Sequence, residues 1–256
     1  WLLAIAGAVV FGAAWAYIPA YLQAKRGSHV VITTIMFNFI ASSLMVFLLV
    51  DVIRDFKQMG PHTVALPKEL WFPTFKELAH LFGVKIRYSP LNLSFLIAIA
   101  ASFFVWFLIW KTKWGYEMRA VGHNTKAAIY AGISPHKNII IAMLISGGLA
   151  GMLSINEILG VHHKIVAGFP AGYGFTGIAV ALMGRNHPIG IFPAAFLFGI
   201  LYQGGSEVTF DMPNITRYMF VAVQGVIILF SGALENLFRP QIESFFVNRI
   251  NKEEMV

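Results

Sequence analysis

The sequence predicts an all-α membrane protein, a polytopic bundle of about seven spanning helices. Hydrophobic residues make up 57% of the 256 positions and charged residues only 12%, whereas a soluble domain carries about 25% charged residues. The apolar residues fall in runs long enough to cross a hydrocarbon core of about 30 Å. The net charge of +7 lies between these runs, where membrane topology and anionic lipid headgroups account for it. We therefore expect the lipid bilayer as a partner and no nucleic acid.

The first apolar segment covers residues 2–22, in which Ala8 and Gly12 offer a small face for close helix packing. Pro19 should kink or end this helix. A clean second span follows at residues 30–50 and is long enough to cross the membrane.

Residues 51–92 interrupt the apolar pattern with charges and prolines. We expect a small external insertion, with an amphipathic stretch at residues 74–82. The next span is predicted at residues 94–110. Three tryptophans at intervals of four residues are typical of an aromatic belt at the membrane interface; they are Trp106, Trp110 and Trp114.

Residues 111–138, here called the coupling loop, form a polar island between two apolar segments. Asn124 is a favourable N-cap for a short helix at residues 125–131, and Gly132 can end that helix in the left-handed conformation. Seven residues are too few for a stable isolated helix, so we expect neighbouring helices and a docked partner to hold it, with Tyr130 protruding. An ordinary loop is the alternative. The next helix should begin with two typical residues, Ser134 as its cap and Pro135 as its first residue.

Residues 138–156 should span the membrane again, with Gly147 and Gly151 as a second close-packing pair. Residues 165–183 are apolar but broken by glycines and a proline, so only residues 175–183 can form a regular helix, too short to cross alone. Non-helical backbone at membrane depth is tolerated only against protein or a watery cavity. This broken segment therefore predicts the side of the bundle that faces a pathway.

The last two spans are predicted at residues 189–203 and 218–234. The expected domain boundaries are 1–240 for the transmembrane domain, with the insertion at 51–92 and the coupling loop at 111–138, and 241–256 for a C-terminal tail.

Polar side chains within the apolar spans indicate either a solute pathway or hydrogen bonds between helices. Amides donate and accept hydrogen bonds without a counter-charge, and aromatic rings stack on ring-shaped solutes. Such a lining suits a neutral polyhydroxylated solute or a nucleobase. The structural alternative is helix–helix hydrogen bonding, worth about 0.6 kcal/mol per contact. The candidate pathway residues are Phe37, Asn38, Asn156, Glu157, Phe175, Gln203 and Gln224.

Catalytic and metal-binding signatures are missing from the sequence. There is no HExxH, no GxSxG and no phosphate-binding GxxxxGK[ST] motif. The chain has no cysteine, and the adjacent pair His162 and His163 point in different directions on a helix or strand. We therefore predict no catalytic residue, no metal site and no cofactor.

Four stretches of the sequence resemble the inner-membrane permease subunits of bacterial ABC importers. Three are Trp15–Asn38, Gly172–Gly190 and Phe198–Pro213. The fourth is the coupling loop, whose matching residues are Gly122, Asn124, Ala127, Ala128, Tyr130, Ala131, Gly132 and Ile133. The resemblance runs from about Trp15 to Pro240 and is greatest to the branched-chain amino acid, ribose and nucleoside permeases, above all the simple-sugar and purine-nucleoside members.

This resemblance implies a multi-pass subunit of the bacterial inner membrane that pairs with itself or with a homologous permease. Two separate ATPase subunits would bind ATP and dock on the coupling loop, and a periplasmic or lipoprotein binding protein would deliver the solute. Nucleosides are the first expectation for the solute, simple sugars the second and branched-chain amino acids the third. The resemblance also implies further helices before Trp1 and an external start to the chain.

Two other classes of function stay open at this point. An ion-coupled secondary transporter should show clustered central acids or paired broken helices, and the sequence shows one broken helix and few central acids. An intramembrane enzyme would need a catalytic constellation, for which the sequence offers no candidate.

Overall fold

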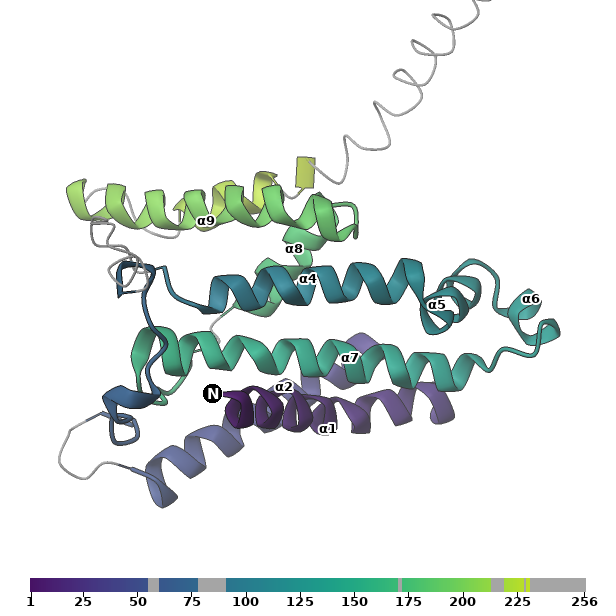
Figure 1. The fold of residues 1–256 in the computed structure, drawn as a ribbon, viewed down its shortest axis with the longest axis horizontal. Coiled ribbons are helices and arrows are strands. Elements are labelled where there is room, and N and C mark those ends of the chain that lie inside the picture. Colours follow the sequence, from purple (N-terminus) through teal and green to yellow (C-terminus); the bar gives the residue numbers. More distant parts are fainter. Residues whose placement is uncertain (55–59, 78–90, 170–171, 213–218, 228, 231–256) are drawn as a thin grey trace, which may run out of the picture. The chain divides into compact units, whose positions relative to one another are not determined.

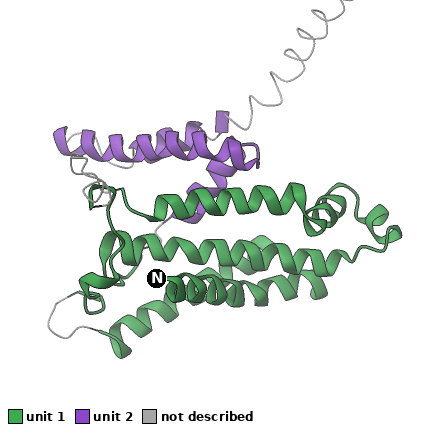
Figure 2. Cartoon of the chain, viewed as in Figure 1, with its two compact units in different colours: residues 1–171 green, residues 172–256 purple. Residues whose placement is uncertain are grey.

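The computed structural model describes residues 1–54, 60–77, 91–169, 172–212, 219–227 and 229–230. The chain divides into two compact units, unit 1 at Trp1–Ala171 and unit 2 at Gly172–Val256 (Figure 2). Helices dominate both units, and the described ranges contain isolated bridges but no strand. The predicted all-α fold is confirmed.

Five helices in the described ranges are long and apolar enough to cross a membrane (Figure 1). They are α1 (Leu2–Arg26), α2 (Val30–Phe47) with its π-helical extension η1 (Leu48–Val52), α4 (Ser94–Lys111), α7 (Pro135–Ile155) with its π-helical extension η3 (Asn156–His162), and α9 (Pro188–Asp211). The broken segment contributes only the shorter helix α8 (Tyr173–Met183). Residues 219–227 are helical, and the rest of the predicted span at 218–234 lies partly outside the described residues.

Helix α1 passes through Pro19 and ends only at Gly27, whose φ of 67° is left-handed. Of the two expectations for this proline, the one that it ends the helix is therefore wrong, and the helix is longer than predicted. The missing hydrogen bond at a proline is tolerated in membrane helices because neighbouring groups satisfy the freed carbonyl. Pro19 is itself buried in unit 1.

Helices α1 and α7 pack closely through the small residues that the sequence marked. A Cβ atom added at Gly151 would clash with the backbone of Ala8, and one added at Gly12 would clash with the carbonyl of Gly147. In a lipid bilayer the hydrophobic effect does not drive two helices together. Small residues let the two backbones approach closely and gain van der Waals contact instead. The two predicted packing pairs therefore meet each other and join these helices.

The described part of the insertion folds back over one end of unit 1. Phe72 is buried with Ile155 and Leu159, and its N–H donates to the Leu159 carbonyl at 3.0 Å. Residues 68–70 form the short 3₁₀ helix η2. Thr74 and Glu77 form a capping box at the start of the predicted amphipathic stretch, and that stretch from residue 78 onward lies outside the described residues.

Unit 2 has its own small core. Ala179 and Val180 of α8 pack against Ala194 and Phe198 of α9. The turn between these helices is tight, since a Cβ at Gly184 would meet the backbone at Gly190.

Candidate functional site

The coupling loop carries the short helix α6 (Thr125–Tyr130), with both ends closed as predicted. The Asn124 side chain accepts a hydrogen bond from the Ala127 N–H at 3.1 Å. At the other end Gly132 has a φ of 78°, and the N–H groups of Gly132 and Ile133 donate to carbonyls of the last turn. This is a Schellman ending, which satisfies the carbonyls that a helix end leaves free.

Helix α6 presents an almost continuous exposed surface around one buried residue. Ala128 is 3% exposed and Tyr130 is 94% exposed. The other predicted coupling residues, Gly122, Asn124, Ala127, Ala131 and Gly132, are exposed as well. A large aromatic ring held out on a capped, anchored helix is typical of a protein–protein anchor. All seven predicted coupling residues thus lie in one short protruding segment, residues 122–132, made of the end of α5, α6 and the turn after it.

Sequence reasoning missed the helix that leads into this protruding segment. Helix α5 (Lys113–His123) begins at Thr112, whose side chain accepts from the Gly115 N–H at 3.2 Å. The break at Thr112 places Trp114 on α5, whereas Trp106 and Trp110 lie on α4, so the interval of four residues does not put the three rings on one helix face. Thr112 as a favourable N-cap was the sequence signal for this helix. The two glycines within α5 argued against a helix, because glycine lowers helix stability.

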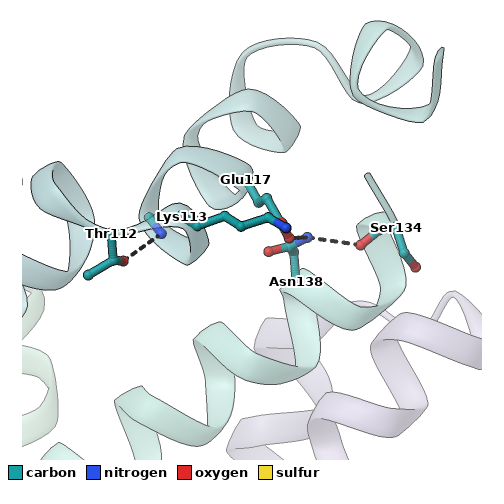
Figure 3. Close-up of polar contacts among 6 residues, drawn as sticks. Thr112, Lys113, Glu117, Ser134 and Asn138 are labelled. Atoms are coloured by element: carbon teal, nitrogen blue, oxygen red, sulfur yellow. Dashed lines mark hydrogen bonds and ion pairs between the residues drawn. The ribbon is translucent and has the colours of Figure 1, made fainter. Parts of the chain in front are cut away.

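A hydrogen-bonded link joins α5 to α7 (Figure 3). The Asn138 Nδ2 donates to the Glu117 Oε2 at 3.4 Å and to the Ser134 carbonyl at 3.0 Å. Asn138 is only 3% exposed. Lys113 lies 4.0 Å from the same glutamate, but its side chain is 86% exposed, so this ion pair contributes little.

A second polar cluster lies at the opposite end of α7, in η3. The Ser94 hydroxyl donates to the Asn156 Oδ1 at 2.6 Å, and the Asn92 amide donates to the same atom at 3.3 Å. Asn156 in turn donates to Glu157, which is buried and lies 3.5 Å from the His162 ring. These contacts fasten the start of α4 to the end of α7. Asn138 and Asn156, at the centres of the two clusters, are 18 residues apart along this helix, which is about 27 Å at about 1.5 Å per residue.

The adjacent histidines are both engaged in this end of unit 1. His162 faces Glu157, whereas the His163 ring stacks on Trp71 with 3.7 Å between ring centroids. Among the residues that the structure describes, no three metal-binding side chains come together.

The remaining candidate pathway residues lie on four helical segments. In unit 1, the Phe37 ring meets Trp15 edge to face at 5.9 Å, and Asn38 is exposed on α2. In unit 2, Phe175 is 72% exposed, Gln203 donates to Glu207 at 3.0 Å, and Gln224 is half-buried. Asn156 and Glu157 share a hydrogen bond, Phe37 and Asn38 are neighbours on α2, and the other three lie on three different helices of unit 2. A role for all seven in a pathway stays a prediction.

Comparison with known proteins gives consistent matches over most of the chain. The family model described as "Branched-chain amino acid transport system / permease component" matches residues 1–232. The guanosine ABC transporter permease protein NupP of Bacillus subtilis is 36% identical over 89% of this chain and 63% of its own length. The glucose ABC transporter permease protein TsgB13 of Haloferax volcanii is 33% identical over 95% of this chain and 64% of its own.

The nucleoside ABC transporter permease protein NupB of Lactococcus lactis is 34% identical over 84% of this chain and 59% of its own length. The chain therefore spans about three-fifths of the length of these relatives. No solved structure matches it significantly.

Proposed function

The chain belongs to the family of branched-chain amino acid transport system permease components, and from this premise we propose that it is the membrane-spanning subunit of an ATP-driven nucleoside importer. The five long apolar helices found in the described part of the chain make it a multi-pass membrane protein. ATP hydrolysis belongs to separate ATPase subunits, as the similarity to ABC transporter permease proteins implies. A second permease subunit completes the pore, and a solute-binding protein delivers the nucleoside.

The observation that carries this proposal is the exposed coupling helix. Tyr130 is 94% exposed on a helix that is capped at both ends and held by buried Ala128. The coupling loop lies on the cytoplasmic side, where an ATPase cleft receives Tyr130 and the neighbouring alanines. The Asn156 cluster lies toward the external side, because it is about 27 Å farther along the helix than Asn138, close to the hydrocarbon thickness of about 30 Å.

Nucleosides are the first choice of solute for two reasons. NupP and NupB carry the words guanosine and nucleoside in their names, and amide and aromatic side chains suit a nucleobase. A simple sugar is the second choice, because the name of TsgB13 specifies glucose. Branched-chain amino acids are third. Weak contacts suffice in such a pathway, because tight binding would hold the solute in place.

Site-specific cross-linking tests the docking surface. The 256 residues contain no cysteine, so Tyr130→Cys introduces the only thiol in this part of the protein. We expect a thiol-reactive cross-linker on the Tyr130→Cys variant to capture the ATPase subunit in membranes. Lys68→Cys, in η2 of unit 1, is the control and should capture none. Capture at Lys68 alone would place the ATPase on the wrong end of this unit and contradict the proposal.

Asn38 gives a prediction for the pathway. Asn38→Leu should lower solute uptake about fivefold, the equivalent of one hydrogen bond of about 1 kcal/mol, without loss of the assembled transporter. Ile40→Leu, at a neighbouring exposed position of α2, is the matched control and should leave uptake unchanged. Initial uptake rates normalised to assembled protein give the answer, and normal uptake by Asn38→Leu would assign this amide to helix packing.

A further inference from the structure

A single buried amide on α7, the helix that follows the coupling helix, fastens α5, the helix that precedes it. Glu117 lies on α5, before the chain enters α6, and Ser134 lies where the chain leaves α6 and begins α7. The Asn138 Nδ2 donates to both, to the Glu117 carboxylate and to the Ser134 carbonyl (Figure 3). The excursion between residues 117 and 134 is therefore closed at its base.

The excursion is also stiff within itself. The Asn124 cap and the Schellman ending at Gly132 close the two ends of α6. At the far end of α5, a Cβ at Gly115 would clash with the Leu108 and Ile109 carbonyls, so the corner with α4 is tightly packed. A docked ATPase that pushes on Tyr130 should therefore move the loop as a rigid body, because packed elements change position more readily than they deform.

The element that receives this movement is α7. Its contact with α1 runs through Gly147 and Gly151 at backbone distance, so no long side chain separates the two helices at these positions. We propose that Glu117 and Asn138 are a positioning pair that transmits the movement of α6 to the joined helices α7 and α1. This inference rests on the proposed function, because it requires α6 to be the site where the ATPase acts.

The chemistry of Asn138 favours this role over simple stabilisation. Its Oδ1 is buried and has no hydrogen-bond partner in the part of the chain that the structure describes. A buried acceptor left unpaired lowers stability relative to an apolar residue of similar size. An amide at this position therefore serves orientation: its donors must face the Glu117 carboxylate and the Ser134 carbonyl, and that requirement fixes the register of α5 on α7.

Four variants separate the link from the fold. Glu117→Leu removes the acceptor, whereas Glu117→Gln keeps a carbonyl oxygen for the Asn138 amide. Asn138→Ser is too short to reach α5, but its hydroxyl can still donate to the Ser134 carbonyl in the preceding turn. Lys113→Ala removes only the exposed ion-pair partner of Glu117 and is the matched control.

The test uses the full-length protein with its ATPase and binding protein in proteoliposomes. The readouts are ATPase retention and the ratio of labelled solute, adenosine or ribose, to ATP hydrolysed. Glu117→Leu and Asn138→Ser should keep the ATPase bound but lower this ratio about fivefold or more, the usual minimum for coupling between sites. Glu117→Gln and Lys113→Ala should match the wild type. The Glu117→Leu/Asn138→Ser double variant should lose no more than either single variant, because the pair acts as one unit.

Three results would overturn the inference. The ratio of solute transported to ATP hydrolysed could be unchanged in both Glu117→Leu and Asn138→Ser, or the losses could add up in the double variant. Loss of ATPase binding or of assembly in these variants would instead assign the pair to the fold. If the wild-type complex takes up solute only with ATP and the disrupting variants keep the wild-type ratio of solute to ATP, the positioning role of Glu117 and Asn138 is refuted and the proposed function stands. A wild-type protein that binds no ATPase would refute the proposed function and the inference with it.

Discussion

Tyr130→Asp should abolish binding of the ATPase subunits while the protein still inserts in the membrane and folds. Tyr130 is 94% exposed, so its replacement disturbs no contact within the chain. In the complex, the same position places a charge in a desolvated aromatic pocket. Loss of an interface anchor costs about 2 kcal/mol or more, and a buried unpaired charge adds to that loss. Binding should therefore weaken by at least about 30-fold.

Co-purification of the ATPase with the tagged permease measures this effect. Tyr130→Phe keeps the ring and should retain most of the ATPase, because the interface uses the aromatic face more than the hydroxyl. Lys68→Asp introduces a larger charge change, of two units instead of one, in η2 and should still retain all of the ATPase. Full retention by Tyr130→Asp would remove α6 from the interface.

Gly151→Leu should prevent α1 and α7 from packing and should destabilise unit 1 by more than about 3 kcal/mol, the upper end for overpacked cores. The added side chain has no rotamer that avoids α1, since its Cβ alone would clash with the Ala8 carbonyl. Backbone cannot move aside as a flexible side chain would. Uptake should fall together with the amount of folded protein.

The amount of monodisperse protein in detergent and its thermal unfolding midpoint measure this loss. Gly7→Leu is the control of equal size on α1, because a Cβ at Gly7 meets nothing within 4 Å, and it should behave as the wild type. A Gly151→Leu protein with wild-type yield and midpoint would show that the close α1–α7 approach is not what holds these helices.

Local features of this chain could be derived from the sequence, because they depend on residues near each other. The cap at Asn124 and the left-handed ending at Gly132 follow from side-chain reach and glycine sterics. The small pairs on α1 and α7 follow from four-residue spacing on one helix face. The sequence did not show that the two pairs meet each other, since either could have faced another helix.

Contacts between distant segments could not be derived. The Asn156 Oδ1 accepts hydrogen bonds from Asn92 and Ser94 across a sequence separation of more than 60 residues, and nothing in the sequence pattern indicates those partners. The sequence predicts an external insertion at residues 51–92. It does not predict that Phe72 of this insertion packs on the end of α7, because that contact joins segments far apart in the chain. The link from Glu117 to Asn138 was hidden in the same way, behind the missed helix α5.

Solute uptake with and without ATP hydrolysis tests the central claim most directly. Cells expressing the full-length protein with its ATPase and binding protein are given labelled adenosine or labelled ribose, and a matched strain carries a hydrolysis-dead ATPase. We predict adenosine uptake that disappears in the hydrolysis-dead strain. Ribose uptake with the same dependence would keep the mechanism and change the solute. Uptake of either solute that survives the dead ATPase would contradict the account and favour ion-coupled transport.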